Sequence, residues 1–312
     1  MYIGIDLGGT NIAAGIVSKD GTLIAKKSIP ARAERKDVEI IRDMAHLAMD
    51  LVAEEKMSMD DVISIGIGSP GSVNKDTGEL IYANNLNFNH TPMRKEMNKY
   101  IDKPIYIDND ANCAAWAEAT AGAAKNVQNS VAVTLGTGVG GGIVIRGELY
   151  SGFNFVGGEL GHMVIQAGGN LCTCGRKGCW EAYASATALI RMTKEAAEEN
   201  QDSLLWECCR QEGKFSGRTA FEAARKGDKV AQQVVDRYIF YVACGLANII
   251  NIFQPEMIVV GGGIANEGEA LLEPVRKMVA KESYTKDIAQ TKIVKAMLGN
   301  DAGIIGAALL KS

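Results

Sequence analysis

Three of the seven cysteines, Cys172, Cys174 and Cys179, lie within eight residues of one another in this 312-residue sequence. The other four are scattered through segments with a helical pattern, where cysteine commonly serves as a small buried side chain. In a reducing compartment, clustered thiols favour metal binding over a disulfide, because thiolates are good metal ligands. The cluster therefore predicts a metal site.

Two glycine-rich turns, at residues 8–11 and 136–142, each follow an apolar run with strand character. Successive backbone N–H groups in a tight turn form a concavity that binds anions, and glycine lets a phosphate approach closely. One such turn alone is most simply an ordinary β-hairpin. The pair of turns, with Asp6 beside the first, favours a polyphosphate gripped from both sides, with Asp6 holding Mg²⁺ through water.

Residues 136–141 also satisfy the dinucleotide-binding pattern G-x-G-x-x-G, and Glu159 follows about 20 residues later. That function requires a helix to begin at the last glycine, because the helix N-terminus holds the pyrophosphate. Here Gly142 is followed by Ile-Val-Ile, which is typical of a strand. We therefore interpret the segment as a strand–turn–strand unit; the Walker pattern does not occur in the sequence.

Residues 107–112, Ile-Asp-Asn-Asp-Ala-Asn, run from the end of a predicted strand into a predicted helix. Asp110 in this segment could accept the proton of an acceptor hydroxyl during phosphoryl transfer, a reaction in which positioning and Mg²⁺ supply most of the catalysis. Aspartate also caps helices well. From the spacing alone, the helix cap is the better interpretation.

The surrounding pattern predicts an α/β protein. The segments around the two turns, residues 5–10 and 133–138, resemble one another, which suggests two related α/β domains facing a single binding cleft. We place the smaller domain at residues 1–109 plus 301–312 and the larger at 110–300. Strands are expected at 2–7, 12–17, 22–29, 62–67, 104–107, 131–135, 257–260 and 292–295. Helices are expected at 36–55, 111–124, 185–210, 219–225, 229–252 and 301–310.

Composition narrows the class of partner. The formal net charge is −4 and lysine and arginine do not cluster, so a nucleic-acid-binding surface is not expected. No run of roughly 20 apolar residues occurs in the sequence, and Asp6 interrupts the window of a signal peptide. The sequence thus predicts a cytoplasmic protein without a membrane partner.

Five motifs together carry a resemblance to a known family. They are Asp6-Leu-Gly-Gly-Thr-Asn11, Leu135-Gly-Thr-Gly-Val-Gly-Gly-Gly142, Glu159-Leu-Gly-His162, Cys172-x-Cys174-Gly-x-x-Gly-Cys179 and Val259-Val-Gly-Gly-Gly263. In this order they resemble the ROK family (repressors, open reading frames and kinases) of the actin-like ATPase superfamily, and the glucokinase branch in particular. The resemblance implies two RNase-H-like α/β domains with ATP and sugar in the cleft between them.

The resemblance also assigns residues to the ligands. The phosphate turns and the segment beside the adenosine supply the ATP and Mg²⁺ site: Asp6, Gly8, Gly9, Thr10, Asn11, Thr134, Gly136, Thr137, Gly138, Gly140, Gly261, Gly262 and Gly263. Asp110 resembles the catalytic base of the family. The residues expected around the sugar are Gly71, Asn84, Asn109, Glu159, His162 and Glu181. Phe88 stands where glucokinase relatives often have tryptophan, a departure that bears on sugar preference.

His162, with Cys172, Cys174 and Cys179, makes one imidazole and three thiolates, which is a complete tetrahedral set for Zn²⁺. Because all four positions are filled, the predicted zinc is structural. We expect it to fix the loop that carries Glu159 and Glu181, and His162 could bind zinc through one ring nitrogen while the other faces the sugar.

The expected activity is ATP-dependent phosphorylation of the 6-hydroxyl of glucose by a homodimer or homotetramer. Kinases for N-acetylmannosamine, N-acetylglucosamine, fructose or allose fit the same motifs, and a non-catalytic sugar sensor is a further alternative. Repressors of the family carry an additional N-terminal DNA-binding domain. The phosphate motif here begins at residue 3, so a regulatory role on DNA is not expected.

Overall fold

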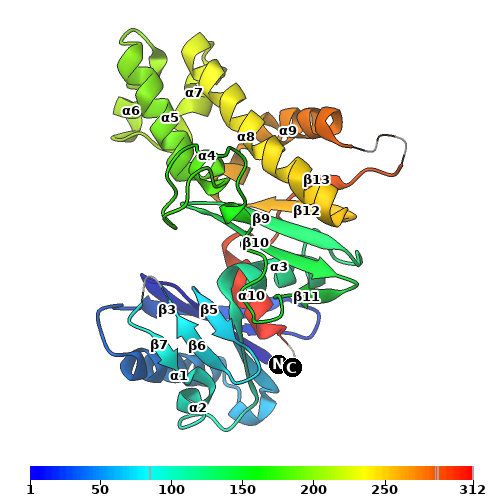
Figure 1. The fold of residues 1–312 in the computed structure, drawn as a ribbon. Coiled ribbons are helices and arrows are strands. Elements are labelled where there is room, and N and C mark those ends of the chain that lie inside the picture. Colours follow the sequence, from blue (N-terminus) through cyan, green and yellow to red (C-terminus); the bar gives the residue numbers. More distant parts are fainter. Residues whose placement is uncertain (84–85, 285, 287, 311–312) are drawn as a thin grey trace. The chain divides into compact units, whose positions relative to one another are not determined.

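The protein is a mixed α/β chain, whose computed structural model describes residues 1–83, 86–284, 286 and 288–310 (Figure 1). The first sheet has the strand order β3-β2-β1-β4-β8. Its strands are β1 (Tyr2–Leu7), β2 (Asn11–Val17), β3 (Leu23–Pro30), β4 (Ser64–Ser69) and β8 (Ile105–Asn109). A small antiparallel sheet contains β5 (Ser72–Asn74), β6 (Glu79–Tyr82) and β7 (Asn89–Thr91).

The second five-stranded sheet has the order β11-β10-β9-β12-β13. Its strands are β9 (Ser130–Leu135), β10 (Val139–Ile145), β11 (Glu148–Tyr150), β12 (Met257–Gly261) and β13 (Lys292–Lys295). In both sheets a strand–turn–strand unit, β1–β2 or β9–β10, occupies the same place in the order. The predicted repetition is therefore present. Strand β10 begins at Val139, inside the G-x-G-x-x-G segment, and continues past Gly141, where a dinucleotide site would need a helix to begin.

The helices are α1 (Asp37–Glu54), α2 (Met93–Met97), α3 (Asp110–Thr120), α4 (Glu181–Ala184), α5 (Ala186–Glu199), α6 (Leu204–Glu212), α7 (Thr219–Arg225), α8 (Lys229–Phe253), α9 (Glu269–Glu282) and α10 (Ala302–Ala308). Among the described residues, no helix combines the length and the apolar character that a membrane span requires.

The prediction of one continuous helix over 185–210 is wrong. Two helices, α5 and α6, occupy this stretch, and the chain leaves the helical path between them. Ser203 begins α6 by accepting a hydrogen bond from Leu205 N at 3.2 Å, and Asp228 accepts one from Leu204 N at 2.6 Å. These side chains satisfy the N–H groups of the first turn, so a new helix begins here. Helices α2 and α9 and the small sheet were not predicted.

The chain forms two compact units: Met1–Ala132 with Gly142–Gly158 and Met297–Ser312, and Val133–Gly141 with Glu159–Ala296. The predicted division placed its boundary at residue 110. The units differ from it because α3 packs against α10, which keeps α3 with the N-terminal residues. The predicted cleft between two domains stays a prediction.

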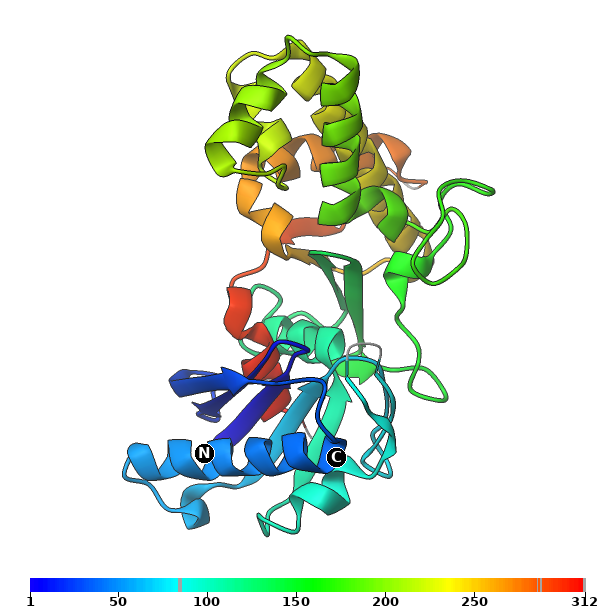
Figure 2. The same cartoon turned by 90° about the vertical axis from the view of Figure 1, so that its left-hand side faces the viewer.

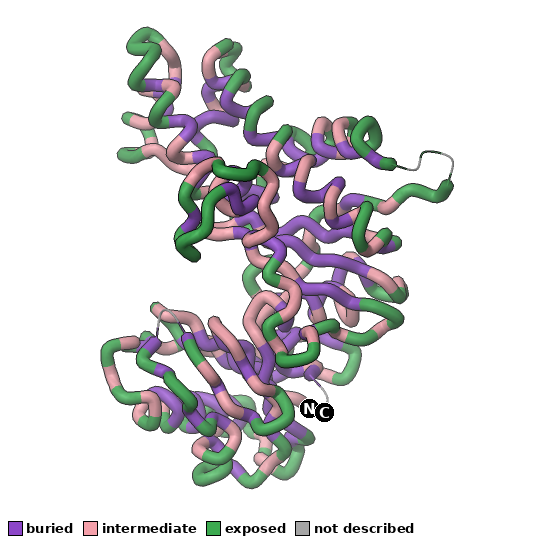
Figure 3. The backbone as a smooth tube through the Cα atoms, in the orientation of Figure 1, coloured by how far each residue is buried: buried purple, intermediate pink, exposed green. Residues whose placement is uncertain are grey.

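Within the first unit, helices cover both faces of the sheet. Helix α1 lies on one face, where its residues Ile40, Ile41 and Met44 are fully buried with the strand residues (Figures 2 and 3). Helices α3 and α10 cover the other face. In the second unit, α8 packs against α5, α7 and α9, as Figure 1 shows.

Glycines let α10 lie directly on the strands. Gly4 of β1 and Gly66 of β4 are opposite one another in parallel register. A Cβ at Gly4 would overlap the carbonyl oxygen of Ile304, and one at Gly66 would overlap that of Ala307. Because real Cβ atoms cannot occupy these positions, any larger residue would push α10 off the sheet.

A buried carboxylate, Glu118 near the end of α3, holds two chain segments together. Its Oε1 accepts hydrogen bonds from the N–H groups of Met297 and Leu298, both at 2.9 Å, and its Oε2 accepts one from Ala123 N at 2.8 Å. Glu118 is only 3% exposed. Met297 is the residue at which the chain returns to the first unit, so Glu118 fixes this point to α3.

We expect Glu118→Gln to lower the free energy of unfolding by about 1–3 kcal/mol, because an amide NH₂ cannot accept and would leave a buried N–H unsatisfied. Urea unfolding of the two proteins measures this difference. The matched control is Glu55→Gln, an exposed residue just after α1, for which the change should stay within about 0.5 kcal/mol. Equal losses in the two variants would contradict this role of Glu118.

Candidate active site

The carboxyl ends of β1, β4 and β8 meet at one edge of the first sheet. The three strands are parallel neighbours, with Asp6 opposite Gly68 and Gly68 opposite Asp108. Ligands of open α/β sheets bind at such an edge, because the loops that follow parallel strands converge there. This edge therefore gathers Asp6, the Gly71 loop and the segment that begins α3.

Asn109, and not Asp110, caps helix α3. The Asn109 Oδ1 accepts hydrogen bonds from Ala111 N at 2.9 Å and Asn112 N at 3.2 Å, which is the N-cap arrangement. Its Nδ2 donates to the carbonyl oxygen of Gly71 at 3.1 Å, so the β4 and β8 loops are tied together. The helix-cap interpretation of Asp110 is thus replaced: Asp110 is the first residue of α3.

The carboxylates of Asp6 and Asp110 lie close enough to interact electrostatically. Burial, together with repulsion from Asp110, raises the pKa of Asp6 from 3.8 to about 6. Burial also raises the pKa of Asp110, while a hydrogen bond from Ala111 N at 2.8 Å partly opposes this. Two acidic groups destabilised by their surroundings are typical of a site that receives a cation or a proton.

The first glycine-rich turn, residues 8–11, joins β1 to β2 directly after Asp6. Gly8 N donates to the carbonyl oxygen of Asn11 at 2.9 Å, which closes the turn. Thr10 and Asn11 are exposed and Gly8 and Gly9 are partly exposed, so their backbone is accessible. The turn can therefore contact a ligand at the same edge as Asp6.

The second turn lies between β9 and β10, and the glycines after β12 lie beside it. Gly136 N donates to the carbonyl oxygen of Gly138 at 3.0 Å. Gly262 has φ +85°, and a Cβ there would press on the backbone of Leu135, the last residue of β9. A Cβ at Gly261 would likewise lie 3.8 Å from Thr134 Cγ2, so the segment after β12 lies beside the end of β9.

Glu181 connects the second turn to the cysteine-rich loop. Its Oε2 accepts a hydrogen bond from Val139 N at 3.0 Å, at the start of β10 and directly after the turn. Its Oε1 accepts from Thr173 Oγ1 at 3.1 Å and contacts Cys172 Sγ at 3.7 Å. One carboxylate thus links two segments that were expected to serve different ligands.

Four candidate metal ligands converge, as predicted. The donor atoms of His162, Cys172, Cys174 and Cys179 all lie within 4.8 Å of one another. The Cys174 and Cys179 sulfurs are 3.7 Å apart, and His162 Nδ1 is 3.6 Å from Cys172 Sγ. Thiolates bound to one Zn²⁺ at about 2.3 Å in a tetrahedron lie roughly 3.8 Å apart, so these spacings fit a single ion. They are too long for a disulfide.

Trp180, which follows Cys179 directly, anchors the cysteine-rich loop in the core of the second unit. It is fully buried, its Nε1 donates to the carbonyl oxygen of Tyr241 at 2.8 Å, and its ring packs on Gly245 of α8. Residues 179, 180 and 181 therefore supply a candidate metal ligand, a core anchor and the link to the glycine turn. Trp180 was not among the predicted residues, although a large aromatic residue between a cysteine and a glutamate was visible in the sequence.

The predicted site residues divide between the two compact units. Asp6, residues 8–11, Gly71, Asn109 and Asp110 belong to the first. The second contains Thr134, Gly136, Thr137, Gly138, Gly140, Glu159, His162, Cys172, Cys174, Cys179, Glu181, Gly261, Gly262 and Gly263. Glu159 is exposed at the start of a short 3₁₀ turn that includes His162. Asn84 lies outside the described residues.

Asp108 is a further buried acid at the first site and was not among the predicted residues. Its Oδ1 accepts hydrogen bonds from Asn109 N at 2.7 Å and from Asn112 Nδ2 at 2.8 Å. Burial raises its pKa despite these bonds. In the sequence, Asp108 could have been noticed as a charged residue directly after the apolar run Ile-Tyr-Ile. Asp108 holds the end of β8 against the first turn of α3, and so positions Asn109 and Asp110.

Comparisons with known proteins agree along the whole chain. The sequence model of the ROK family matches residues 2–312. A glucokinase of Thermotoga maritima is 36% identical over 307 residues, which cover 98% of this chain and 95% of that protein.

Two solved structures extend this similarity. A ROK family glucokinase from Streptomyces griseus, in complex with glucose and AMPPNP, is 33% identical with a TM-score of 0.81, covering 98% of this chain and 97% of that one. A ROK hexokinase from Thermus thermophilus is 32% identical with a TM-score of 0.80, covering 98% and 96%. These similarities confirm the predicted actin-like α/β fold.

The raised pKa of Asp6 predicts a dependence of stability on pH. Between 3.8 and about 6, the folded protein holds a proton on Asp6 that the unfolded chain has lost, so its stability falls as the pH rises through this window. Asp6→Asn removes the titrating group. It should therefore raise the free energy of unfolding at neutral pH, by on the order of 2 kcal/mol, and flatten the profile below it.

Urea unfolding at a series of pH values measures this effect. Asp102→Asn, at an exposed position, is the control and should leave the profile unchanged. If Asp6→Asn is no more stable than the original protein at neutral pH, the burial argument for Asp6 is wrong.

Proposed function

The chain belongs to the ROK family, and on that basis we propose that it is an ATP-dependent kinase that phosphorylates the 6-hydroxyl group of glucose. Similarity to glucokinases over nearly the full length of both chains supports the proposal. The observation that carries the chemistry is the position of Asp110, a partly buried carboxylate at the carboxyl ends of the parallel strands.

Asp110 acts as the general base. As the 6-hydroxyl oxygen of the sugar bonds to the γ-phosphorus of ATP, the bond from that phosphorus to the bridging oxygen breaks and ADP leaves. The hydroxyl proton passes to the Asp110 carboxylate. Because burial destabilises the charged form of Asp110, its pKa is raised and it is a better proton acceptor than an exposed aspartate.

Asn109, the Gly71 loop, Glu159, His162 and Glu181 orient the sugar. Amide and carboxylate groups can each bond two neighbouring hydroxyls, which suits a hexose. The side chain of Asn109 is already held by its bonds to the α3 N-terminus and to Gly71. Such restraint supports a role in positioning, because a fixed group loses little entropy when the substrate binds.

ATP binds through the two glycine-rich turns, with residues 261–263 beside the adenosine. Asp6 would hold Mg²⁺ through water, a role that suits a hard oxygen ligand. When bound, Mg²⁺ neutralises the charge that develops on the phosphate oxygens. The raised pKa of Asp6 agrees with this assignment, since a carboxylate next to another acid gains most from a nearby cation.

We also assign a structural Zn²⁺ to His162, Cys172, Cys174 and Cys179. The donor set is closed at four ligands, so the ion would fix the loop and not bind substrate. His162 offers Nδ1 to this cluster, which leaves Nε2 for the sugar. Through Glu181 the fixed loop also supports the second glycine turn.

The first test is Asp110→Asn in a coupled ADP-release assay with a panel of hexoses. We expect kcat to fall about 10²–10⁴-fold, because the amide cannot take up the proton. Asp50→Asn on the exposed side of α1 is the control and should keep full activity. Full activity of a folded Asp110→Asn protein would refute its role, and turnover of no hexose by the original protein would favour a sugar sensor.

The zinc assignment is tested with Cys172→Ser. Metal analysis should show loss of about one zinc per chain, and the KM for the sugar should rise because the loop with Glu159 and Glu181 is released. Cys209→Ser, remote in sequence from the four ligands, should retain its zinc. Unchanged zinc content together with an unchanged sugar KM in Cys172→Ser would overturn the assignment.

A further inference from the structure

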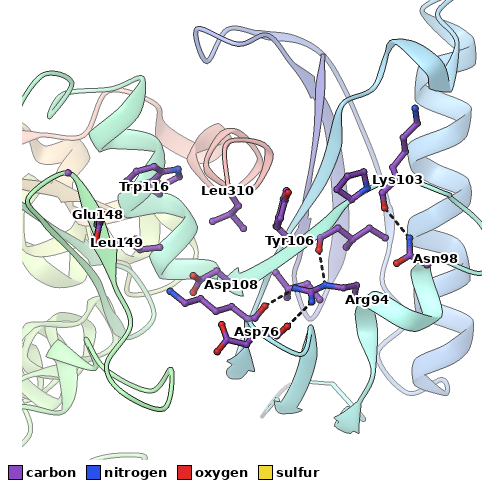
Figure 4. Close-up of a pocket in the computed structure, with 15 residues that line it drawn as sticks. Asp76, Arg94, Asn98, Lys103, Tyr106, Asp108, Trp116, Glu148, Leu149 and Leu310 are labelled. Atoms are coloured by element: carbon purple, nitrogen blue, oxygen red, sulfur yellow. Dashed lines mark hydrogen bonds between the residues drawn. The ribbon is translucent and has the colours of Figure 1, made fainter. Parts of the chain in front are cut away.

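We propose that a cavity on the outer side of β8 is a second binding site, which takes a neutral saccharide larger than a single hexose. The cavity has a volume of about 970 Å³, and all its lining residues belong to the first compact unit (Figure 4). Its residues are not among those predicted to bind ATP or the substrate sugar. The volume is at the upper end for a small-molecule site, which is roughly 300–1,000 Å³.

One end of the cavity is an aromatic and apolar platform. Tyr106, Trp116 and Leu149 are partly exposed there, and they pack against a small buried cluster that includes Leu310. The Trp116 Nε1 donates to the carbonyl oxygen of Leu309 at 2.9 Å, so its polar atom is already used. What these residues offer to a ligand is fixed apolar surface, which suits the C–H face of a sugar ring.

The balance of charges on the lining residues disfavours an anionic ligand. Three cationic side chains, Lys75, Arg94 and Lys103, are balanced by three carboxylates, Asp76, Asp108 and Glu148. A phosphate or nucleotide would need an excess of positive charge. Hydroxyl groups, in contrast, donate to carboxylates and accept from ammonium groups equally well. A neutral polyhydroxylated compound therefore matches the lining best.

Arg94 supports the wall of the cavity, and most of its hydrogen-bonding groups are used within the protein. Its guanidinium donates to the carbonyl oxygens of Lys75 at 2.7 Å, Asp76 at 2.8 Å and Ile105 at 2.9 Å (Figure 4). These bonds tie the turn before β6 to the start of β8. They use three of the five N–H groups of the guanidinium, so only two remain for a ligand.

Asp108 joins this cavity to the candidate active site. Its carboxylate contributes to the lining, while its Oδ1 holds Asn109 N and Asn112 Nδ2. A hydroxyl that donates to the Asp108 carboxylate would therefore act on the segment that positions Asp110. We infer that the occupant changes the kcat or KM of the hexose reaction. This effect rests on the proposed kinase function, whereas the binding itself does not.

The test is isothermal titration of the protein with maltotriose at millimolar concentrations, compared with glucose 6-phosphate. The decisive variant is Leu149→Trp, in which the larger side chain fills the apolar end. We expect it to bind maltotriose at least roughly tenfold more weakly. Tyr150→Trp is the matched control, because Tyr150 is the next residue of β11, is exposed and does not line the cavity.

Asp76→Ala provides a second variant if Leu149→Trp folds poorly, because the Asp76 side chain is exposed. It too should weaken maltotriose binding, with an unchanged melting temperature. Three results would each overturn the proposal. The first is no binding of maltotriose, and the second is equal binding of maltotriose by the original protein and both lining variants. The third is preferential binding of glucose 6-phosphate that Leu149→Trp abolishes. If only the kinase assay fails, the proposed kinase function is wrong, and the maltotriose titration still decides whether the cavity binds a saccharide.

Discussion

The parallel pairing of β1, β4 and β8 is the constraint on which the first site depends. Because the strands run in the same direction and in register, Asp6 and the Asn109–Asp110 segment emerge at one edge. Burial there destabilises their charges, and the proximity of Asp6 to Asp110 adds to the effect. The sheet thus imposes an energetic cost on the folded protein that a bound cation would relieve, which is typical of a functional site.

The pairing can persist only because α10 lies against it without intervening side chains. Gly4 and Gly66 have no side chain that would keep α10 away from the strands. Gly306 of α10 likewise lets α10 contact the backbone of Cys113 on α3 directly. Helix α3 carries Asp110 at its beginning and Glu118 near its end. Packing of one helix therefore positions both the proposed base and the carboxylate that holds the chain where it returns to the first unit.

The second unit combines its functions in three consecutive residues. Cys179 belongs to the cluster of candidate metal ligands, Trp180 is buried against α8, and Glu181 accepts a hydrogen bond from Val139 N, directly after the second glycine turn. Successive residues can serve such different partners because their side chains point in different directions from one short stretch of backbone. A metal ion in this cluster would therefore stabilise the second glycine turn as well as the loop that bears Glu159.

The sequence by itself determined the α/β class, the two strand–turn–strand units and the gathering of His162 with three cysteines, because apolar periodicity and ligand spacing are local properties. The identity of the α3 cap, the roles of Asp108, Glu118 and Trp180, and the cavity beside β8 were decided only by the tertiary structure. Each depends on contacts between residues distant along the chain, such as Glu118 with Met297. Hydrogen-bond partners and burial of this kind arise from packing, which no local pattern specifies.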